Sequence, residues 1–196
     1  MRAAARHPHA DSRAPQVLDA AARLFRAQGF EGTSVRDIAR AVGMLPGSIY
    51  CHFATKEDLL LAVYVKGVTQ ISAAVRLAVS RQTDPWSRLE AACIAHLEAI
   101  LQDDDYAQVV VRVRPSDAPA ANGRLIVLRD EYEALLGELL NALPLARRTD
   151  RSTLRLMLLG ALNWSQTWYR SGGGLTPRTI ARRFVALLRQ GQEGTA

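Results

Sequence analysis

The stretch that decides the fold runs from Thr33 to Lys56 and reads TSVRDIARAVGMLPGSIYCHFATK. Its first half has the pattern of a short amphipathic helix, because apolar residues recur at the i, i+3, i+4 and i+7 spacing of one helix face. These residues are Val35, Ile38, Ala39 and Val42. Ser34 is a natural N-cap, and Asp37 three residues later completes a capping-box pattern. Gly43 can take the left-handed conformation that ends this helix and turns the chain.

A second short helix is expected to begin at Pro46, because proline suits the first turn of a helix. Its apolar side carries Ile49 and Phe53. Its other side is small, hydrogen-bonding or aromatic and consists of Gly47, Ser48, Tyr50 and Cys51. A helix that keeps its large apolar residues inward and offers such side chains outward fits a DNA major groove. The two helices therefore predict a helix-turn-helix.

The same residues resemble the DNA-binding domain of the TetR family of bacterial transcriptional regulators. The family pattern is a glycine turn, a helix that reads roughly G-S-hydrophobic-Y-x-H-F, and a helix start that reads S/T-K-E-x-L-L. The matching positions are Gly43, Gly47, Ser48, Ile49, Tyr50, His52, Phe53, Thr55, Lys56, Glu57, Leu59 and Leu60. Weaker matches extend back to Ala20, so the resemblance covers the first third of the chain.

The predicted fold is all-α, with about nine helices and no strand-like alternation. Helices are expected over residues 15–28, 55–80, 85–101, 106–114, 124–143 and 150–171, and from 177 onward, besides the two short ones. The resemblance implies a DNA-binding domain over residues 14–60 and a helical effector-binding and dimerisation domain over 61–196. Residues 1–13 are expected to form a mobile basic arm that is either simply disordered or reaches DNA phosphates or the minor groove.

The DNA contacts are predicted within the opening stretch. They are Thr33, Ser34, Leu45, Pro46, Gly47, Ser48, Tyr50, Cys51, His52 and Lys56. Tyr50 is expected to offer its hydroxyl to a phosphate and its ring to a sugar or a thymine methyl group. Lys56 suits a phosphate by its charge. The resemblance implies phosphate contacts for His52, Thr33 and Ser34.

Plainer roles stay open for several of these residues. Tyr50 can be a half-buried surface residue, His52 can pack beside Phe53, and the hydroxyl of Thr33 or Ser34 can simply cap a helix.

Two positions depart from the family pattern. Leu45 stands where the family often has Ser or Thr at the N-cap of the second helix, and leucine cannot cap. We expect Leu45 to pack or to make an apolar base contact. Cys51 stands where a large side chain is usual, which removes a direct base reader. A small surface filler is a simpler reading of Cys51 than a redox switch.

The segment NWSQTWY at residues 163–169 carries Trp164 and Trp168 four residues apart, and therefore on one helix face. This face can be aromatic core, dimer packing or the wall of a ligand pocket. Together with residues 43–48, the segment resembles a TetR subgroup whose effectors are often acyl-CoA thioesters or related hydrophobic carboxylates. The arginines proposed for the effector's phosphates are Arg112 and Arg170, with Arg114 and Arg124 as alternatives.

The resemblance also implies a homodimer through the last two helices and a double-stranded, pseudo-palindromic DNA operator. The net charge of +6 suits an anionic partner. The two cysteines form no metal-binding pattern, and the acidic run at residues 103–105 reads as a loop, so neither a metal nor a cofactor is expected. We expect a cytoplasmic chain without a membrane span.

Two other classes of function were weighed against a ligand-responsive repressor. An all-α enzyme is disfavoured because the chain has no GxSxG, HExxH, P-loop or dinucleotide glycine motif. Its histidines, His7, His9, His52 and His96, have no paired acid or nucleophile in the sequence, so no catalytic residue is predicted. A helical adaptor without DNA binding is the other alternative, and operator binding would distinguish the two.

Overall fold

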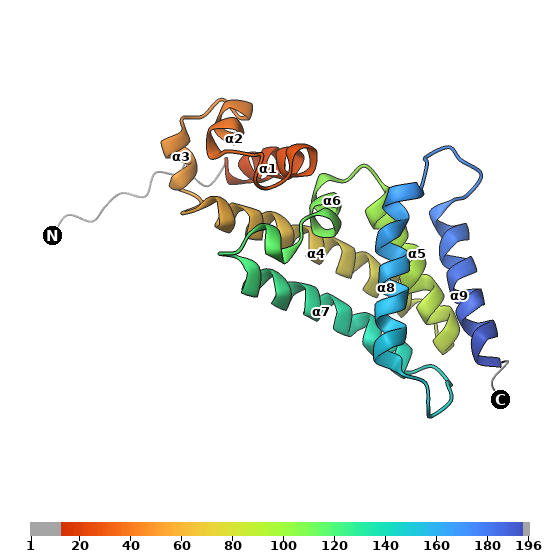
Figure 1. Cartoon of the computed structure of the whole chain (residues 1–196). Coiled ribbons are helices and arrows are strands. Elements are labelled where there is room, and N and C mark those ends of the chain that lie inside the picture. Colours follow the sequence, from red (N-terminus) through yellow and green to blue (C-terminus); the bar gives the residue numbers. More distant parts are fainter. Residues whose placement is uncertain (1–12, 194–196) are drawn as a thin grey trace.

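The computed structural model describes residues 13–193, and every regular element among them is a helix (Figure 1). In chain order they are α1 Ala14–Gln28, α2 Val35–Ala41, α3 Pro46–Tyr50, α4 Lys56–Ser80, α5 Pro85–Leu101, α6 Asp105–Arg112, the short 3-10 helix η1 Pro115–Asp117, α7 Asn122–Asn141, α8 Arg151–Trp168 and α9 Pro177–Glu193. The all-α prediction is confirmed. The basic arm expected over residues 1–13 lies outside the described residues, apart from Arg13 at the N-cap of α1.

Local sequence signals account for most helix ends. The capping box at Ser34 is present, since its side chain accepts from the Asp37 amide and the Asp37 side chain accepts from the Ser34 amide. Gly43 has a φ of 64°, as expected for the turn that follows α2. Thr55 caps α4 by accepting from the Asp58 amide at 3.0 Å. These caps fix where α2 and α4 begin.

Two helices end earlier than predicted. α6 stops at Arg112 rather than residue 114, because Val113 takes an extended backbone conformation and the residue before Pro115 is disfavoured in a helix. α8 stops at Trp168 because Tyr169 is extended as well. Arg170 therefore lies in the loop between α8 and α9, and not on a helix face.

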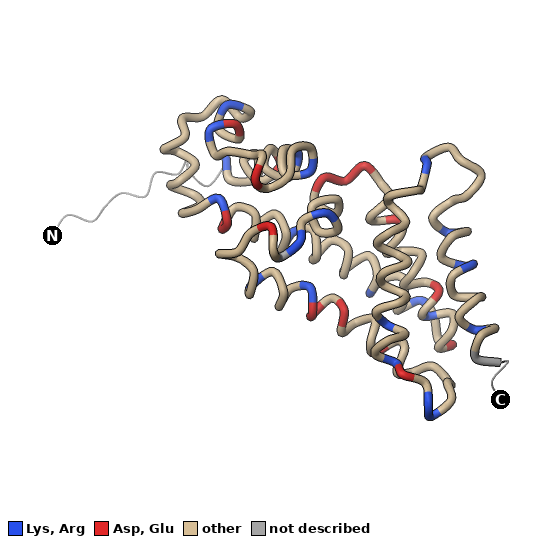
Figure 2. The backbone as a smooth tube through the Cα atoms, viewed as in Figure 1, with Lys and Arg blue, Asp and Glu red and all other residues tan. Residues whose placement is uncertain are grey.

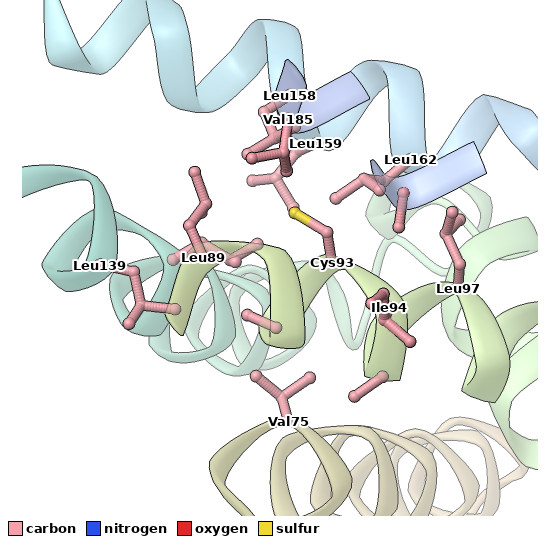
Figure 3. Close-up of a cluster of buried hydrophobic side chains, with 14 of the residues drawn as sticks. Val75, Leu89, Cys93, Ile94, Leu97, Leu139, Leu158, Leu159, Leu162 and Val185 are labelled. Carbon is pink, nitrogen blue, oxygen red and sulfur yellow. The ribbon is translucent and has the colours of Figure 1, made fainter. Parts of the chain in front are cut away.

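The buried apolar side chains form two clusters. We call α1, α2 and α3 the head, and α5 to α9 the body. The first cluster joins the head to the first half of α4, to α6 and to the start of α7. The second joins the last part of α4 to α5, α7, α8 and α9. Figure 3 shows the centre of the second cluster, where Cys93 of α5 lies among Leu158 and Leu162 of α8, Val185 of α9 and other apolar side chains.

α4 belongs to both clusters and is continuous from head to body (Figure 1). The expected domain boundary between residues 60 and 61 thus falls inside an unbroken helix. α4 also crosses α6 very closely at Gly67. A Cβ at Gly67 would lie 2.6 Å from Cγ2 of Val110 and 2.7 Å from the carbonyl oxygen of Tyr106, so no other residue fits without displacing α6.

By length and mean hydropathy alone, α4 could cross a membrane, with a value of 1.3 over an 18-residue window. This corrects the expectation that no such stretch exists. The apolar side of α4 is, however, covered by α1, α5, α6 and α7. Leu59, Leu60, Val63 and Val75 are each fully buried there. α4 therefore has the surroundings of a core helix.

Polar side chains also tie the head to the body. Arg26 of α1 pairs with Asp103 in the loop before α6 and, at 2.9 Å, with Asp105, the first residue of α6. Figure 2 shows this acidic stretch as a red segment beside α1. The hydroxyl of Tyr106 in α6 donates to Asp19 of α1 at 2.5 Å, and that hydrogen bond is the main reason why the pKa of Asp19 is lowered. α6 is thus attached to both α1 and α4.

Candidate nucleic-acid interface and effector cavity

The outer face of α3 carries two large exposed side chains. Ile49 is buried and holds α3 against the head, whereas Leu45 is 76% exposed and Tyr50 is 52% exposed. Gly47 and Cys51 are also exposed, and the Cys51 thiol donates to the Gly47 carbonyl at 3.6 Å. This is the arrangement that the sequence predicts, with a small, apolar and aromatic surface turned outward beside the glycine turn.

The remaining predicted contacts on α3 and after it are partly buried. Pro46 occupies the first turn of α3, and the Ser48 amide donates to the Leu45 carbonyl at 2.9 Å. The His52 ring lies 6.5 Å from the Phe53 ring, centroid to centroid. His52 therefore has a packing partner and a partly exposed ring, so its phosphate contact stays a prediction.

Thr33 differs from its expected role as a surface phosphate contact. Its side chain is buried, with 1% exposed, and its hydroxyl lies 2.8 Å from the Gly29 carbonyl and 3.2 Å from the Leu24 carbonyl. Its amide donates to the Phe30 carbonyl at 3.3 Å. Both polar groups are thus used inside the head, and Thr33 shapes the loop between α1 and α2.

Lys56 is likewise engaged within the chain. Its ammonium group donates to the carbonyls of Phe30 at 2.9 Å and Thr33 at 3.2 Å, and it lies 4.0 Å from the centre of the Phe30 ring. In this conformation Lys56 holds the α1–α2 loop against the start of α4. A phosphate contact by Lys56 would have to share its three donors with these carbonyls.

Ser34 remains at the surface. Its hydroxyl lies 2.5 Å from Oδ2 of Asp37, and that hydrogen bond is the largest cause of the lowered pKa of Asp37. Arg40 pairs with the other carboxylate oxygen of Asp37 at 3.0 Å. Arg36 and Arg40 are both exposed on α2, so exposed cations lie on the helix that precedes α3 in the helix-turn-helix.

A cavity of about 190 Å³ lies between α4, α5, α6, α7 and α8. Its apolar lining is made by Val68, Ile71, Val110, Val111, Val113 and Leu159. Its other lining residues include Tyr64, His96, Tyr132 and Asn163, which bring hydroxyl, imidazole and amide groups into the same space. An apolar cavity with a few convergent polar groups is the usual form of a small-molecule site.

The polar part of the cavity is a chain of three side chains from α5, α7 and α8. Nδ1 of His96 lies 2.5 Å from the Tyr132 hydroxyl, and Nε2 lies 3.0 Å from Oδ1 of Asn163. Since Oδ1 can only accept, Nε2 carries the ring hydrogen and Nδ1 accepts from Tyr132. Burial lowers the pKa of His96 to about 4, so the imidazole is neutral at pH 7.

Charged residues border the cavity in the segment after α6 and on α7. Arg114 and Arg129 line it and are exposed, and Glu133 lies beside them. Glu133 pairs with Arg129 at 3.4 Å and with Arg155 of α8 at 2.9 Å. Arg129 also pairs with Asp130 at 3.0 Å. The cavity thus combines an apolar interior, a neutral polar chain and a border of two arginines and one glutamate.

The effector residues predicted from sequence do not line this cavity, so their roles stay predictions. Trp164 and Trp168 are 68% and 43% exposed, and neither lines the cavity. Successive helix residues are turned by about 100°, so Asn163 faces inward while Trp164 faces away from it. Arg112 and Arg170 are exposed and outside the cavity lining, whereas Arg114, the weaker candidate, lines it.

Sequence reasoning missed His96 and Tyr132, because their partners lie on other helices. One signal was available for His96. It falls within ACIAHLEAIL at residues 92–101, an apolar stretch in which a histidine is buried and must find hydrogen-bond partners. Among residues 13–193, no group of three or more His, Cys, Asp or Glu side chains could hold a metal ion.

An exposed helix follows a glycine turn in a three-helix head, and α4 joins this head to a helical body that holds a cavity. This arrangement is that of a helix-turn-helix DNA-binding protein with a helical second domain. The family model for bacterial regulatory proteins of the tetR family matches residues 17–63, and the model for a tetracyclin repressor-like C-terminal domain matches residues 82–192. The chain belongs to the TetR family and is a DNA-binding transcriptional regulator, not an enzyme.

Similar proteins match about nine tenths of the chain. The transcriptional repressor KstR2 of Mycobacterium tuberculosis is 30% identical over 186 residues, which cover 91% of this chain and 92% of that protein. KstR2 of Rhodococcus jostii is 31% identical over 187 residues, covering 91% and 90%. The crystal structure of AibR in complex with isovaleryl coenzyme A and operator DNA has a TM-score of 0.77 at 25% identity and covers 89% of this chain and 97% of that one.

Proposed function

We propose that the chain is a homodimeric repressor that leaves a pseudo-palindromic operator when a small hydrophobic effector, of the acyl-CoA or carboxylate class, occupies the His96 cavity. The observation that carries this proposal is the cavity itself, with its apolar walls, its neutral polar chain and two arginines at its border. AibR, which is similar over most of its length, binds an acyl-CoA and operator DNA, and the KstR2 relatives are repressors.

The size of the cavity favours a short acyl group. An engineered cavity of about 150 Å³ in another protein holds benzene, so a space of about 190 Å³ suits a branched or single-ring group rather than a long chain or fused rings. A carbonyl oxygen of the effector can accept from Nε2 of His96 in place of Asn163. Arg114 and Arg129 then suit phosphates or a carboxylate at the border.

The proposed dimer uses α8 and α9. Large apolar side chains are exposed along these two helices, namely Leu156, Met157, Trp164, Trp168 and Leu187. An exposed aromatic and aliphatic surface of this kind is typical of a protein interface. A two-fold dimer would place two copies of α3 about 34 Å apart, which is one turn of DNA. Such a regulator would act in the cytoplasm.

Effector binding would act by changing populations. The effector would bind a second conformation more tightly than it binds the DNA-binding conformation. The ratio of its affinities for the two conformations would then set how much operator is released. α6 carries residues that line the cavity and also contacts α1 and α4. A shift of α6 on effector binding would therefore change the position of the head.

The first experiment measures binding to the DNA upstream of the protein's own gene by fluorescence anisotropy at several salt concentrations. We expect specific binding that weakens steeply with salt. Tyr50→Ala should weaken binding while the protein stays dimeric, and Leu77→Ala, at an exposed position of α4, is the matched control. Absence of specific binding at low salt, after removal of any bound ligand, would contradict the proposal.

The second experiment identifies the effector class. Mass spectrometry of material that co-purifies, followed by release assays with acyl-CoA thioesters of increasing acyl size, should show the strongest release with short acyl groups. His96→Ala should raise the concentration needed for release without changing operator affinity. Equal release of the wild-type protein and His96→Ala would exclude the cavity as the effector site.

A further inference from the structure

The DNA-facing surface of α3 lacks the side chains that most often read bases. Direct readout in the major groove commonly uses two hydrogen bonds from Arg, Lys, Asn or Gln to one base. Residues 41–55 contain none of these four residue types, and no Asp or Glu. The exposed cations Arg36 and Arg40 lie earlier, on α2. Any base recognition by α3 must therefore use another kind of contact.

Leu45 is the side chain best placed for such a contact. It is 76% exposed, the largest fraction of any large hydrophobic side chain in the described part of the chain. Its neighbour Met44 packs against the head, so the two residues point in different directions. Pro46 follows directly and restricts the backbone of Leu45, which is extended with a ψ of 144°. The backbone of Leu45 is thus held in place while its side chain stays largely exposed.

The surroundings of Leu45 leave its side chain free to approach a base. Gly47 adds no side chain to this surface, and beyond its chain neighbours and the backbone of its own helix no atom lies within 4 Å of where its Cβ would be. Leu45 makes no capping hydrogen bond at the start of α3. An exposed leucine side chain on the DNA-facing surface stabilises a complex by being buried against an apolar partner. The thymine 5-methyl is the apolar group that a base edge presents in the major groove.

We propose that Leu45 reads a thymine in each operator half-site by packing against its 5-methyl group. This inference rests on the DNA-binding function and specifies which base atom the head recognises. Removal of one methyl group from such a contact should weaken binding about fourfold per half-site, or about sixteenfold when both half-sites of a symmetric operator are altered.

The test uses the full-length protein and an operator selected from randomised DNA duplexes. Each thymine of that operator is replaced in turn by deoxyuridine, which lacks only the 5-methyl group, and affinities are measured for the wild-type protein, Leu45→Ala and Leu77→Ala. Leu45 is exposed, so Leu45→Ala should keep the same thermal unfolding midpoint as the wild-type protein.

We expect one thymine per half-site at which deoxyuridine weakens wild-type and Leu77→Ala binding but leaves Leu45→Ala binding unchanged. The proposal is overturned if no thymine shows this difference, or if Leu45→Ala keeps the full sensitivity to deoxyuridine. Failure of the wild-type protein to select any duplex would instead contradict the proposed operator binding. The two failures are therefore distinguishable.

Discussion

The DNA-facing surface and the proposed effector cavity differ in how their residues are distributed along the chain. The first comes from a single stretch, residues 33–56, whose shape is set by caps, a glycine turn and a proline. The second is assembled from five helices, with polar groups on α5, α7 and α8. The difference teaches that a site formed by one short segment can be predicted from its local sequence signals. A site formed by the packing of distant helices can be predicted only in part.

The head can be compared with the rest of the chain by asking whether it binds the operator without the proposed dimer surface. A substitution in α8 tests this and has the largest expected effect. Trp164→Glu places a charge in the proposed dimer surface. Because interface aromatic residues often contribute about 2 kcal/mol or more, the dimer dissociation constant should rise at least about thirtyfold. Operator affinity should fall with it. Sedimentation velocity would show the dissociation.

The control for this test is Leu77→Glu, which puts the same charge on an exposed leucine of α4. If the Trp164→Glu protein is still dimeric at the concentration at which the wild-type protein is dimeric, α8 does not form the interface.

The buried polar chain of the cavity gives a pH dependence that the head should not share. The pKa of His96 is lowered from 6.5 to about 4, chiefly by burial. Below pH 6.5 the unfolded chain therefore binds a proton that the folded chain does not, and the free energy of unfolding falls as the pH decreases. The loss should reach about 3 kcal/mol near pH 4 and then level off.

Urea unfolding between pH 7.5 and 4.5 measures this effect, with His96→Gln as the variant that lacks the titrating group. The carboxylates with lowered pKa, such as Asp37 and Asp58, lose their contribution below their ordinary value of 3.8, and so outside this window. If both proteins showed the same pH slope, His96 would not be the source.

Thr33 and Ser34 provide a matched pair inside the head. Thr33→Val removes a buried hydroxyl that bonds backbone carbonyls, so the free energy of unfolding should fall by about 2 kcal/mol while operator affinity of the folded protein is unchanged. Urea unfolding and anisotropy measure the two quantities. Weaker operator binding with unchanged stability would restore Thr33 as a phosphate contact.

Ser34→Ala should have the smallest effect on stability, about 1 kcal/mol, because it removes one N-cap. Its operator affinity should fall if the exposed hydroxyl or the start of α2 contacts a phosphate. A Ser34→Ala protein with wild-type operator affinity would limit Ser34 to its capping role.

These two residues also show what could be predicted from sequence. The capping box at Ser34 depends on residues three apart, and the prediction of the start of α2 is confirmed. The burial of Thr33 depends on carbonyls of α1 and of the turn after it, and the side chain of Lys56 reaches the same loop from α4. Neither contact has a signal in the local pattern, so the sequence predicts that Thr33 and Lys56 lie at the surface.

The cavity shows the same limit more strongly. The pattern at residues 163–169 favours Trp164 and Trp168 because of their aromatic size, whereas the residue of this segment that lines the cavity is Asn163. His96 and Asn163 are 67 residues apart, and only the packing of α5 against α8 brings them together.

The continuity of α4 has a mechanical consequence. At a rise of 1.5 Å per residue, its 25 residues span about 38 Å. A tilt of about 5° at the body end would therefore move the head end by about 3 Å. In a two-fold dimer the two displacements are opposite, so the separation of the two copies of α3 would change by up to about 6 Å against a DNA repeat of about 34 Å. In the proposed dimer, a tilt of α4 by this amount would therefore misalign both heads with the operator.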